Sequence, residues 1–308
     1  MPDLMAAEAA IFEELRACLP NSIVKQNEPL AKKTTLRVGG PAEVWVEPAS
    51  EEELARTVRF CAERCLPFRV LGRGSNLLIR DGGVRGVVAC LSHESFCAIA
   101  AHGNTLRCGA GAKLKAVSAR ARELSLTGLE FLDGIPGSVG GALRMNAGAM
   151  GAATFDVITK VRFMDSGGRV AECASVEAPF EYRSSPFFKS RIALAAVFAG
   201  QPAPREEITE RSRAFNEKRW ESQPKEPSAG CIFKNPSIAA GKLIDELGLK
   251  GARIGGAVVS PAHANFIIND GSATASDVLA LIELIKEKAR AERGIDLQTE
   301  VEIIGEDL

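Results

Sequence analysis

Glycines at seven positions between Gly128 and Gly151 give this segment a backbone suited to holding a phosphate group. It carries almost no charge between Gly134 and Leu143, and its apolar residues favour burial. A flexible linker would contain serine and other polar residues instead. Because glycine has no side chain, main-chain amides can approach an anion closely and surround it. We therefore expect an anion site built from the amides of Gly137, Ser138, Gly140 and Gly141.

A second glycine cluster, LGRGSNLL, occupies residues 71–78 after a short apolar run that predicts the end of a strand. Neither cluster fits the two commonest phosphate-binding motifs. The later one has the spacing Gly134-x-x-Gly137-x-x-Gly140 rather than G-x-G-x-x-G, and the chain contains no Gly-Lys-Ser or Gly-Lys-Thr. One such cluster is usually a tight turn, but two together favour a bound ligand.

The composition is that of a globular protein with small-molecule partners. The chain has 308 residues, 46% hydrophobic and 25% charged, which is enough for two or three cores. With 38 basic and 39 acidic residues, the chain has a net charge of −1, so no overall electrostatic field would attract it to nucleic acid or an anionic membrane. We expect no membrane segment, no signal peptide and no obligate protein partner. Eight cysteines without C-x-x-C pairs indicate reduced thiols and a cytoplasmic location.

Helical and strand patterns alternate along the chain and predict an α+β fold. A capping box at Ser50 and Glu53 predicts the start of one helix. We expect helices at 2–19, 51–64, 112–124, 205–221, 239–247 and 275–293. We expect strands at 42–46, 68–71, 77–79, 84–91, 96–101, 105–108, 158–164, 169–173, 192–199, 257–260, 265–268 and 299–304.

Six motifs, in order, resemble those of the UDP-N-acetylenolpyruvoylglucosamine reductases, the MurB family. They are LGRGSNLLI, GIPGSVGGALRMNAGAMG, EYRSSPF, PSAGCIFKNP, SPAHANFIIN and QTEVEIIG, within residues 34–305. The resemblance implies an FAD-binding domain of the vanillyl-alcohol-oxidase (PCMH) type in two lobes, plus a C-terminal α+β substrate-binding domain. We expect the lobes at 1–93 and 94–201, the substrate domain at 202–296, and a C-terminal strand carrying Glu300 at 297–308. Only 48 positions separate Arg183 from Cys231, which resembles the shorter class of the family, without its sheet-forming insertion.

The implied reaction reduces UDP-N-acetylglucosamine enolpyruvate to UDP-N-acetylmuramate, with NADPH as hydride donor and noncovalent FAD as cofactor. The resemblance places the FAD at both glycine clusters. The residues that it implies there are Gly72, Arg73, Gly74, Ser75, Asn76, Leu77, Gly134, Ile135, Pro136, Gly137, Ser138, Gly140, Gly141, Asn146, Ala147 and Gly148.

Three residues match the catalytic positions of the family. Hydride transfer to the enolpyruvyl group leaves negative charge on its carboxylate, and the guanidinium of Arg183 suits that charge. Glu300 matches the acid that acts beside it. Cys231 stands where the family commonly has a serine that protonates the alpha carbon. A thiol, with an ordinary pKa of about 8.5, is a better acid than an alcohol, so we expect Cys231 to keep this role.

Each of these residues also has a plainer interpretation. Arg183 alone would be a surface ion pair and Glu300 a solvated strand end. Cys231 would be a small buried residue, with water as the proton source. By resemblance, Tyr182, Lys225, Lys234 and Asn235 line the substrate site. The alternatives for the whole protein are an FAD-linked oxidase of the same fold, acting on an alcohol or lactone, and a nucleotide-sugar-binding regulator without flavin.

Overall fold

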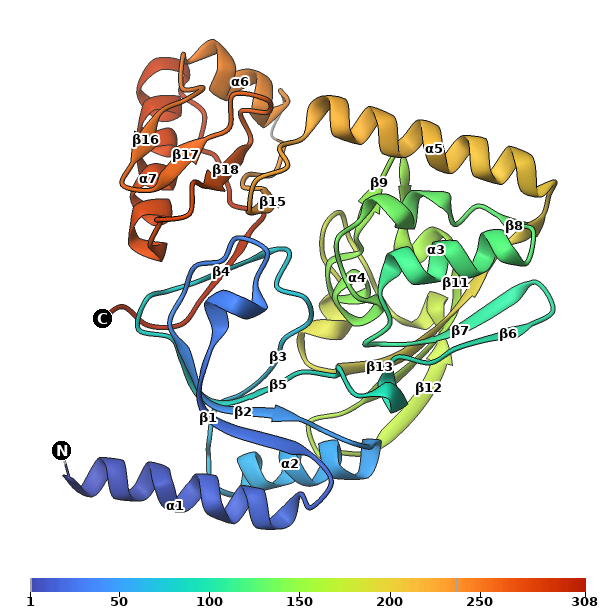
Figure 1. Ribbon diagram of the computed structural model, residues 1–308, viewed down its shortest axis with the longest axis vertical. Coiled ribbons are helices and arrows are strands. Elements are labelled where there is room, and N and C mark those ends of the chain that lie inside the picture. Colours follow the sequence, from blue (N-terminus) through green and yellow to red (C-terminus); the bar gives the residue numbers. More distant parts are fainter. Residues whose placement is uncertain (1, 236–237) are drawn as a thin grey trace. The chain divides into compact units, whose positions relative to one another are not determined.

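The chain divides into two compact units, each assembled from separated stretches of sequence. A computed structural model describes residues 2–235 and 238–308, with side chains from residue 10 onward. The first unit comprises Met1–Asn27, Val44–Gly72 and Gly86–Glu217. The second comprises Glu28–Glu43, Arg73–Arg85 and Lys218–Leu308. Figure 1 labels the elements of both. Within the described residues, no helix is long and apolar enough to span a membrane.

A four-stranded sheet forms one part of the first unit. Its order is β1 (Ile23–Pro29), β2 (Pro41–Glu47), β5 (Val84–Ala89) and β3 (Phe68–Val70), and β3 pairs with β5 in parallel. Helices α1 (Pro2–Cys18) and α2 (Glu51–Glu63) lie beside this sheet (Figure 1). Leu15, Val46 and Phe60 belong to the buried cluster that joins helices and strands. The apolar faces of both helices therefore stabilise the sheet.

Helix α2 begins as expected, but only half of the capping box forms. The Ser50 hydroxyl accepts the amide of Glu53 at 3.2 Å. The Glu53 carboxylate does not return this contact to Ser50 and instead accepts hydrogen bonds from Asn21 and Ser22. The acid therefore ties α2 to the turn before β1.

A five-stranded antiparallel sheet forms the rest of the first unit. Its order is β12 (Val170–Ala174), β11 (Ile158–Met164), β13 (Ile192–Ala199), β7 (Thr105–Gly109) and β6 (Ile99–His102). Helix α3 (Leu114–Glu123), the 3₁₀ turn Glu130–Gly134 and helix α4 (Val139–Met145) share its hydrophobic core. Two short pairs, β8 (Leu126–Thr127) with β14 (Gln201–Pro202) and β9 (Gly148–Ala149) with β10 (Ala152–Ala153), complete the unit. The glycine-rich segment is thus packed backbone, as expected, but it contains a short helix that its glycines concealed.

Helix α5 (Arg205–Ser222) connects this unit to the next, and its charged surface agrees with the sequence. The second unit contains the antiparallel sheet β15 (Ser228–Cys231), β18 (Phe266–Asn269), β17 (Ala257–Val259) and β16 (Arg253–Ile254). Helices α6 (Ala240–Glu246) and α7 (Ala275–Arg293) share its core. Strand β19 (Glu302–Ile304) pairs in parallel with β4 (Leu77–Ile79). Leu36, Val38 and Leu78 contribute to this core from far earlier in the chain.

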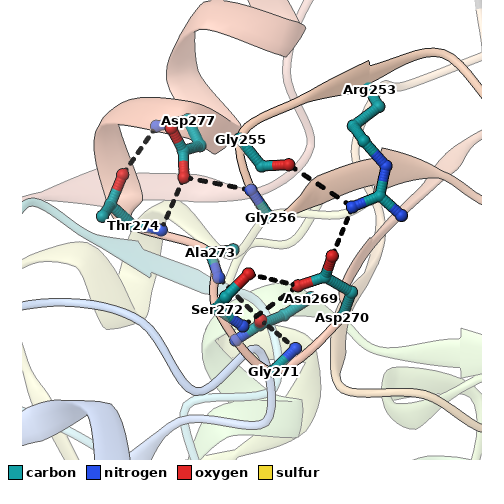
Figure 2. Close-up of polar contacts among 10 residues, drawn as sticks. All are labelled: Arg253, Gly255, Gly256, Asn269, Asp270, Gly271, Ser272, Ala273, Thr274 and Asp277. Atoms are coloured by element: carbon teal, nitrogen blue, oxygen red, sulfur yellow. Dashed lines mark hydrogen bonds and ion pairs between the residues drawn. The ribbon is translucent and has the colours of Figure 1, made fainter.

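Polar side chains build the turn from β18 into α7 (Figure 2). Thr274 and Asp277 form a full capping box that the sequence analysis missed. Asn269 accepts the amides of Gly271 and Ala273, while Asp270 pairs with Arg253 and bonds with Ser272 (Figure 2). These contacts hold the pKa of Asp270 at about 2, chiefly through the Ser272 hydroxyl and the Arg253 guanidinium. Each buried or half-buried polar group here finds a partner.

Most predicted elements are present within one or two residues, but the last strand is shorter than expected. It covers Glu302–Ile304, so Glu300 precedes β19 rather than lying on it. The expected domain ranges stay a prediction. The two compact units differ from them chiefly because 28–43 and 73–85 group with the C-terminal region.

Candidate active site

Arg183 lies at a tight turn in the first unit. Glu181 and Ser184 close the turn through two backbone hydrogen bonds, 2.7 Å from the Glu181 amide and 3.3 Å from the Ser184 amide. Arg183 has a positive φ of 56°, a conformation that is strained for a residue with a side chain. Its guanidinium carbon lies 5.3 Å from the centre of the Tyr182 ring, which is 61% exposed. The turn therefore presents an arginine and an aromatic ring together.

Glycines of the later cluster leave room for neighbours within the same unit. A Cβ on Gly148 would lie 3.2 Å from Nη1 of Arg183 and 2.6 Å from the carbonyl oxygen of Ala152. A Cβ on Gly140 would lie 3.2 Å from the Cβ of Ala110. Both glycines are therefore required by close packing within the chain.

The predicted anion cradle is smaller than expected. The Gly137 amide donates to the carbonyl of Ile135 at 2.9 Å, and the Gly140 amide donates to that of Ala110 at 2.8 Å. These two amides serve the fold rather than an anion, which corrects that part of the expectation. Ser138 is the N-cap of α4, and Gly141 lies in its first turn. The cradle is reduced to these two positions.

The two glycine clusters meet in the first unit. A Cβ on Gly72 would lie 2.9 Å from the hydroxyl oxygen of Ser138, so a larger residue at 72 would displace the Ser138 side chain. Gly72 is nevertheless exposed, as is Pro136, while Ile135 packs against the core. The main chain at Gly72 is therefore exposed to solvent without a side chain to cover it, and exposed main chain of this kind suits a bound nucleotide.

Cys231 and Glu300 come from neighbouring segments of the second unit. The Glu300 amide donates to the carbonyl of Ile232 at 2.8 Å, and Phe233 forms an isolated β-bridge with Thr299. Cys231 is half-buried at the end of β15 and follows Gly230, whose φ is 77°. The predicted thiol and carboxylate therefore project from backbone segments that are hydrogen-bonded to each other.

The earlier glycine cluster continues into this second unit. The Asn76 side chain donates from Nδ2 to the Glu300 carbonyl at 3.1 Å, and the Glu302 amide donates to the Asn76 carbonyl at 3.0 Å. A Cβ on Gly74 would lie 2.7 Å from the Lys33 carbonyl, so Gly74 also serves close packing. Arg73 is exposed, while Ser75 and Leu77 are half-buried. No local sequence pattern indicated that Asn76 supports the Glu300 segment.

The predicted substrate residues of this unit differ in their surroundings. Lys225 is exposed and Lys234 is half-buried. The Asn235 side chain accepts the Ala240 amide at 3.1 Å, at the start of α6. His263 belongs to the motif SPAHANFIIN. Its Nδ1 accepts the Asn265 amide, and burial lowers its pKa. His263 is thus a structural residue, as a lone histidine beside a strand usually is.

Comparison with known proteins identifies two domains. Residues 42–174 match the family described as FAD binding domain, and residues 223–304 match the C-terminal domain of UDP-N-acetylenolpyruvoylglucosamine reductase. Together with the observed mixture of helices and sheets, these matches confirm the α+β fold class, with an FAD-binding domain and a separate C-terminal domain.

Relatives match nearly the whole chain. A UDP-N-acetylenolpyruvoylglucosamine reductase of Carboxydothermus hydrogenoformans is 45% identical, over 97% of this chain and 99% of its own length. One of Clostridium botulinum, strain Alaska E43, is 43% identical, over 92% of this chain and 94% of its own. The crystal structure of the reductase from Thermus caldophilus superposes with a TM-score of 0.81 at 38% identity, covering 92% of this chain and all of that one.

Proposed function

Because the chain belongs to the UDP-N-acetylenolpyruvoylglucosamine reductase family, we propose that it converts UDP-N-acetylglucosamine enolpyruvate to UDP-N-acetylmuramate. NADPH is the hydride donor and FAD the cofactor, and the product is a precursor of peptidoglycan. The structural observation that most supports the proposal is the hydrogen bonding between the Cys231 and Glu300 segments. It supports a proton donor and an acid working side by side.

The first unit fits an FAD. A side chain on Gly72 would meet the Ser138 hydroxyl, and the Gly72 backbone is exposed. The two glycine clusters supply bare main chain there, which suits a diphosphate. We assign the cofactor to fifteen of the sixteen residues expected from the sequence, with Ser138 and Gly141 as the amide donors. Asn146 is left out because both ends of its carboxamide are hydrogen-bonded within the chain. When bound, the flavin accepts a hydride and passes it to the substrate.

The chain's own residues would handle charge and protons. Arg183 is always protonated, and its planar guanidinium suits a carboxylate whose negative charge grows during reduction. Cys231 would give its thiol proton to the alpha carbon of the enolpyruvyl group. Glu300, from the adjacent segment, would act beside it. Tyr182, Lys225, Lys234 and Asn235 would bind the sugar and diphosphate of the substrate.

Anaerobic half-reactions test this proposal. NADPH should bleach the yellow protein, and the enolpyruvyl nucleotide sugar should restore the oxidised flavin spectrum with formation of UDP-N-acetylmuramate. Oxygen, added separately, should reoxidise the flavin more slowly. Reoxidation by oxygen alone would instead support an oxidase, an interpretation that the reductase relatives do not favour.

We also propose that the protein acts in the cytoplasm. All eight cysteines are free thiols, a state that reducing compartments maintain. Cell fractionation with an antibody against the chain would test this location, and recovery from an oxidising compartment would contradict it.

A further inference from the structure

We propose that Asn146 is a positioning residue for Arg183. Its carboxamide fixes the turn at residues 181–184, so that the guanidinium is held in one place before substrate binds. The inference rests on the proposed function, because it takes Arg183 as the group that meets the substrate carboxylate. It changes the expected role of Asn146 from a cofactor contact to a support for that arginine.

Both ends of the Asn146 carboxamide form hydrogen bonds within the first unit. Its Nδ2 donates to the carbonyl of Glu181 at 3.2 Å, and its Oδ1 accepts the amide of Phe155 at 3.1 Å. Asn146 is 7% exposed and ends α4 in the left-handed conformation, with a φ of 41°. Asparagine is one of the few residues other than glycine that adopt this conformation readily.

The carbonyl that Asn146 holds is the one that closes the arginine turn. The oxygen of Glu181 accepts both the Ser184 amide at 3.3 Å and the Asn146 side chain at 3.2 Å. Between Glu181 and Ser184 the chain passes through Arg183 in its strained conformation. Such a conformation persists only when the surroundings fix it. The Asn146 carboxamide provides such a restraint at the Glu181 carbonyl.

The other end of the carboxamide reaches the same loop through an aromatic pair. The rings of Phe155 and Phe180 stack with their centres 4.6 Å apart. Oδ1 of Asn146 accepts the Phe155 amide, and the Phe155 ring stacks on Phe180 just before the arginine turn. The Asn146 side chain is therefore linked to this loop at both of its ends. Two residues later, Gly148 leaves space beside Nη1 of Arg183. The segment 146–148 therefore holds the turn and bounds the guanidinium.

The test is an Asn146→Gly variant, because glycine keeps the left-handed backbone and removes only the carboxamide. Anaerobic stopped-flow measurements follow the two half-reactions separately, and hydrogen exchange follows the amides of Glu181 and Ser184. A matched control is Thr154→Val. Thr154 is fully buried in the same region and donates to the Ala147 carbonyl at 2.7 Å, but that bond does not involve the arginine turn.

We expect Asn146→Gly to slow reoxidation by the enolpyruvyl substrate by up to about 10²-fold, since a displacement of about 1 Å has that effect. Flavin reduction by NADPH should change by less than about twofold, because the arginine acts only in the second half-reaction. Exchange at the Glu181 and Ser184 amides should accelerate. Thr154→Val should lower the melting temperature to a similar extent without any of these effects.

Two kinetic outcomes would overturn the proposal: equal slowing of both half-reactions, or the selective loss appearing in Thr154→Val as well. Unchanged exchange at the turn in Asn146→Gly would overturn it too, and this measurement needs no substrate. Failure of the proposed function would look different. The wild-type reduced flavin would then not respond to the enolpyruvyl nucleotide sugar at all, while the exchange measurement would still report on Asn146.

Discussion

The Arg183 turn in the first unit and the Glu300 segment in the second are each held by an asparagine side chain, but they differ in how many other contacts hold them. In each, an asparagine from a glycine-rich motif donates to a backbone carbonyl, Asn146 to Glu181 and Asn76 to Glu300 itself. Two further backbone hydrogen bonds hold the Glu300 segment, one from the Glu300 amide to Ile232 and one from the Glu302 amide to Asn76. Arg183 lies in a strained turn. The arginine should therefore depend more on its asparagine than the acid does.

The largest effect should come from removing the arginine without disturbing its turn. We expect Arg183→Gly to lower kcat/KM by about 10³-fold, because the charge that grows on the substrate carboxylate loses its fixed partner. Relief of the left-handed strain, about 1 kcal/mol, should offset the added flexibility of glycine, so the melting temperature should change by only about 4 °C. Steady-state kinetics and calorimetry measure both. A variant that unfolds early would show that the arginine stabilises the turn instead.

Replacement of the thiol should affect only one half-reaction. We expect Cys231→Ala to slow reoxidation by the enolpyruvyl substrate by about 10²-fold and to leave reduction by NADPH intact, because the proton donor is lost. Cys231→Ser is the matched control and should retain much of the rate. If Cys231→Ala reoxidises at the wild-type rate, water delivers the proton and the thiol is only a small half-buried residue.

The asparagine of the second unit should matter less than that of the first. We expect Asn76→Ala to lower kcat/KM by about fivefold, which corresponds to one hydrogen bond of about 1 kcal/mol. Bonds at Ile232 would still hold the Glu300 backbone. Parallel assays of Asn76→Ala and Asn146→Gly compare the two losses in kcat/KM directly. A larger loss in Asn76→Ala would reverse the comparison.

Mild acid should loosen the second unit first. Burial lowers the pKa of His263, so this histidine stabilises the fold above its unfolded pKa of about 6.5. That contribution is lost as the pH falls through the lower folded value. Hydrogen exchange at pH 7.5 and 5.5 should therefore show faster opening around Asn265 and Phe266 than around Arg183. A His263→Gln variant should abolish the difference, and equal opening in both regions would argue against this cause.

Sequence patterns predicted most helices and strands because their apolar periodicity is strong. Helix α7 and strand β11 match the expected bounds fully, and the motif order indicated the family. The patterns did not reveal how the glycines are used. Gly140 and Gly148 admit parts of the chain from distant positions, and only the folded backbone shows this. Glu300 fell outside its predicted strand because its partner is the Ile232 carbonyl rather than a regular ladder.

The roles of the two asparagines were equally hidden. Asn146 follows a helix that the glycines concealed, although an asparagine at such a position is a known helix terminator. Asn76 acts on a carbonyl 224 positions away, a distance that no local pattern spans. The catalytic residues were identified through the motifs, whereas their supports required the fold.

The pairing of β4 with β19 has a consequence for synthesis on the ribosome. Strand β4 finds its partner only at Glu302–Ile304, near the end of the chain. With 224 positions between Asn76 and Glu300, and translation at about 5–20 residues per second, β4 waits roughly 10 to 45 s for that partner. During this interval Leu78, buried in the finished protein, lacks its final neighbours. A nascent chain stalled before residue 300 should therefore bind chaperones at 73–85, and its second unit should form only after release.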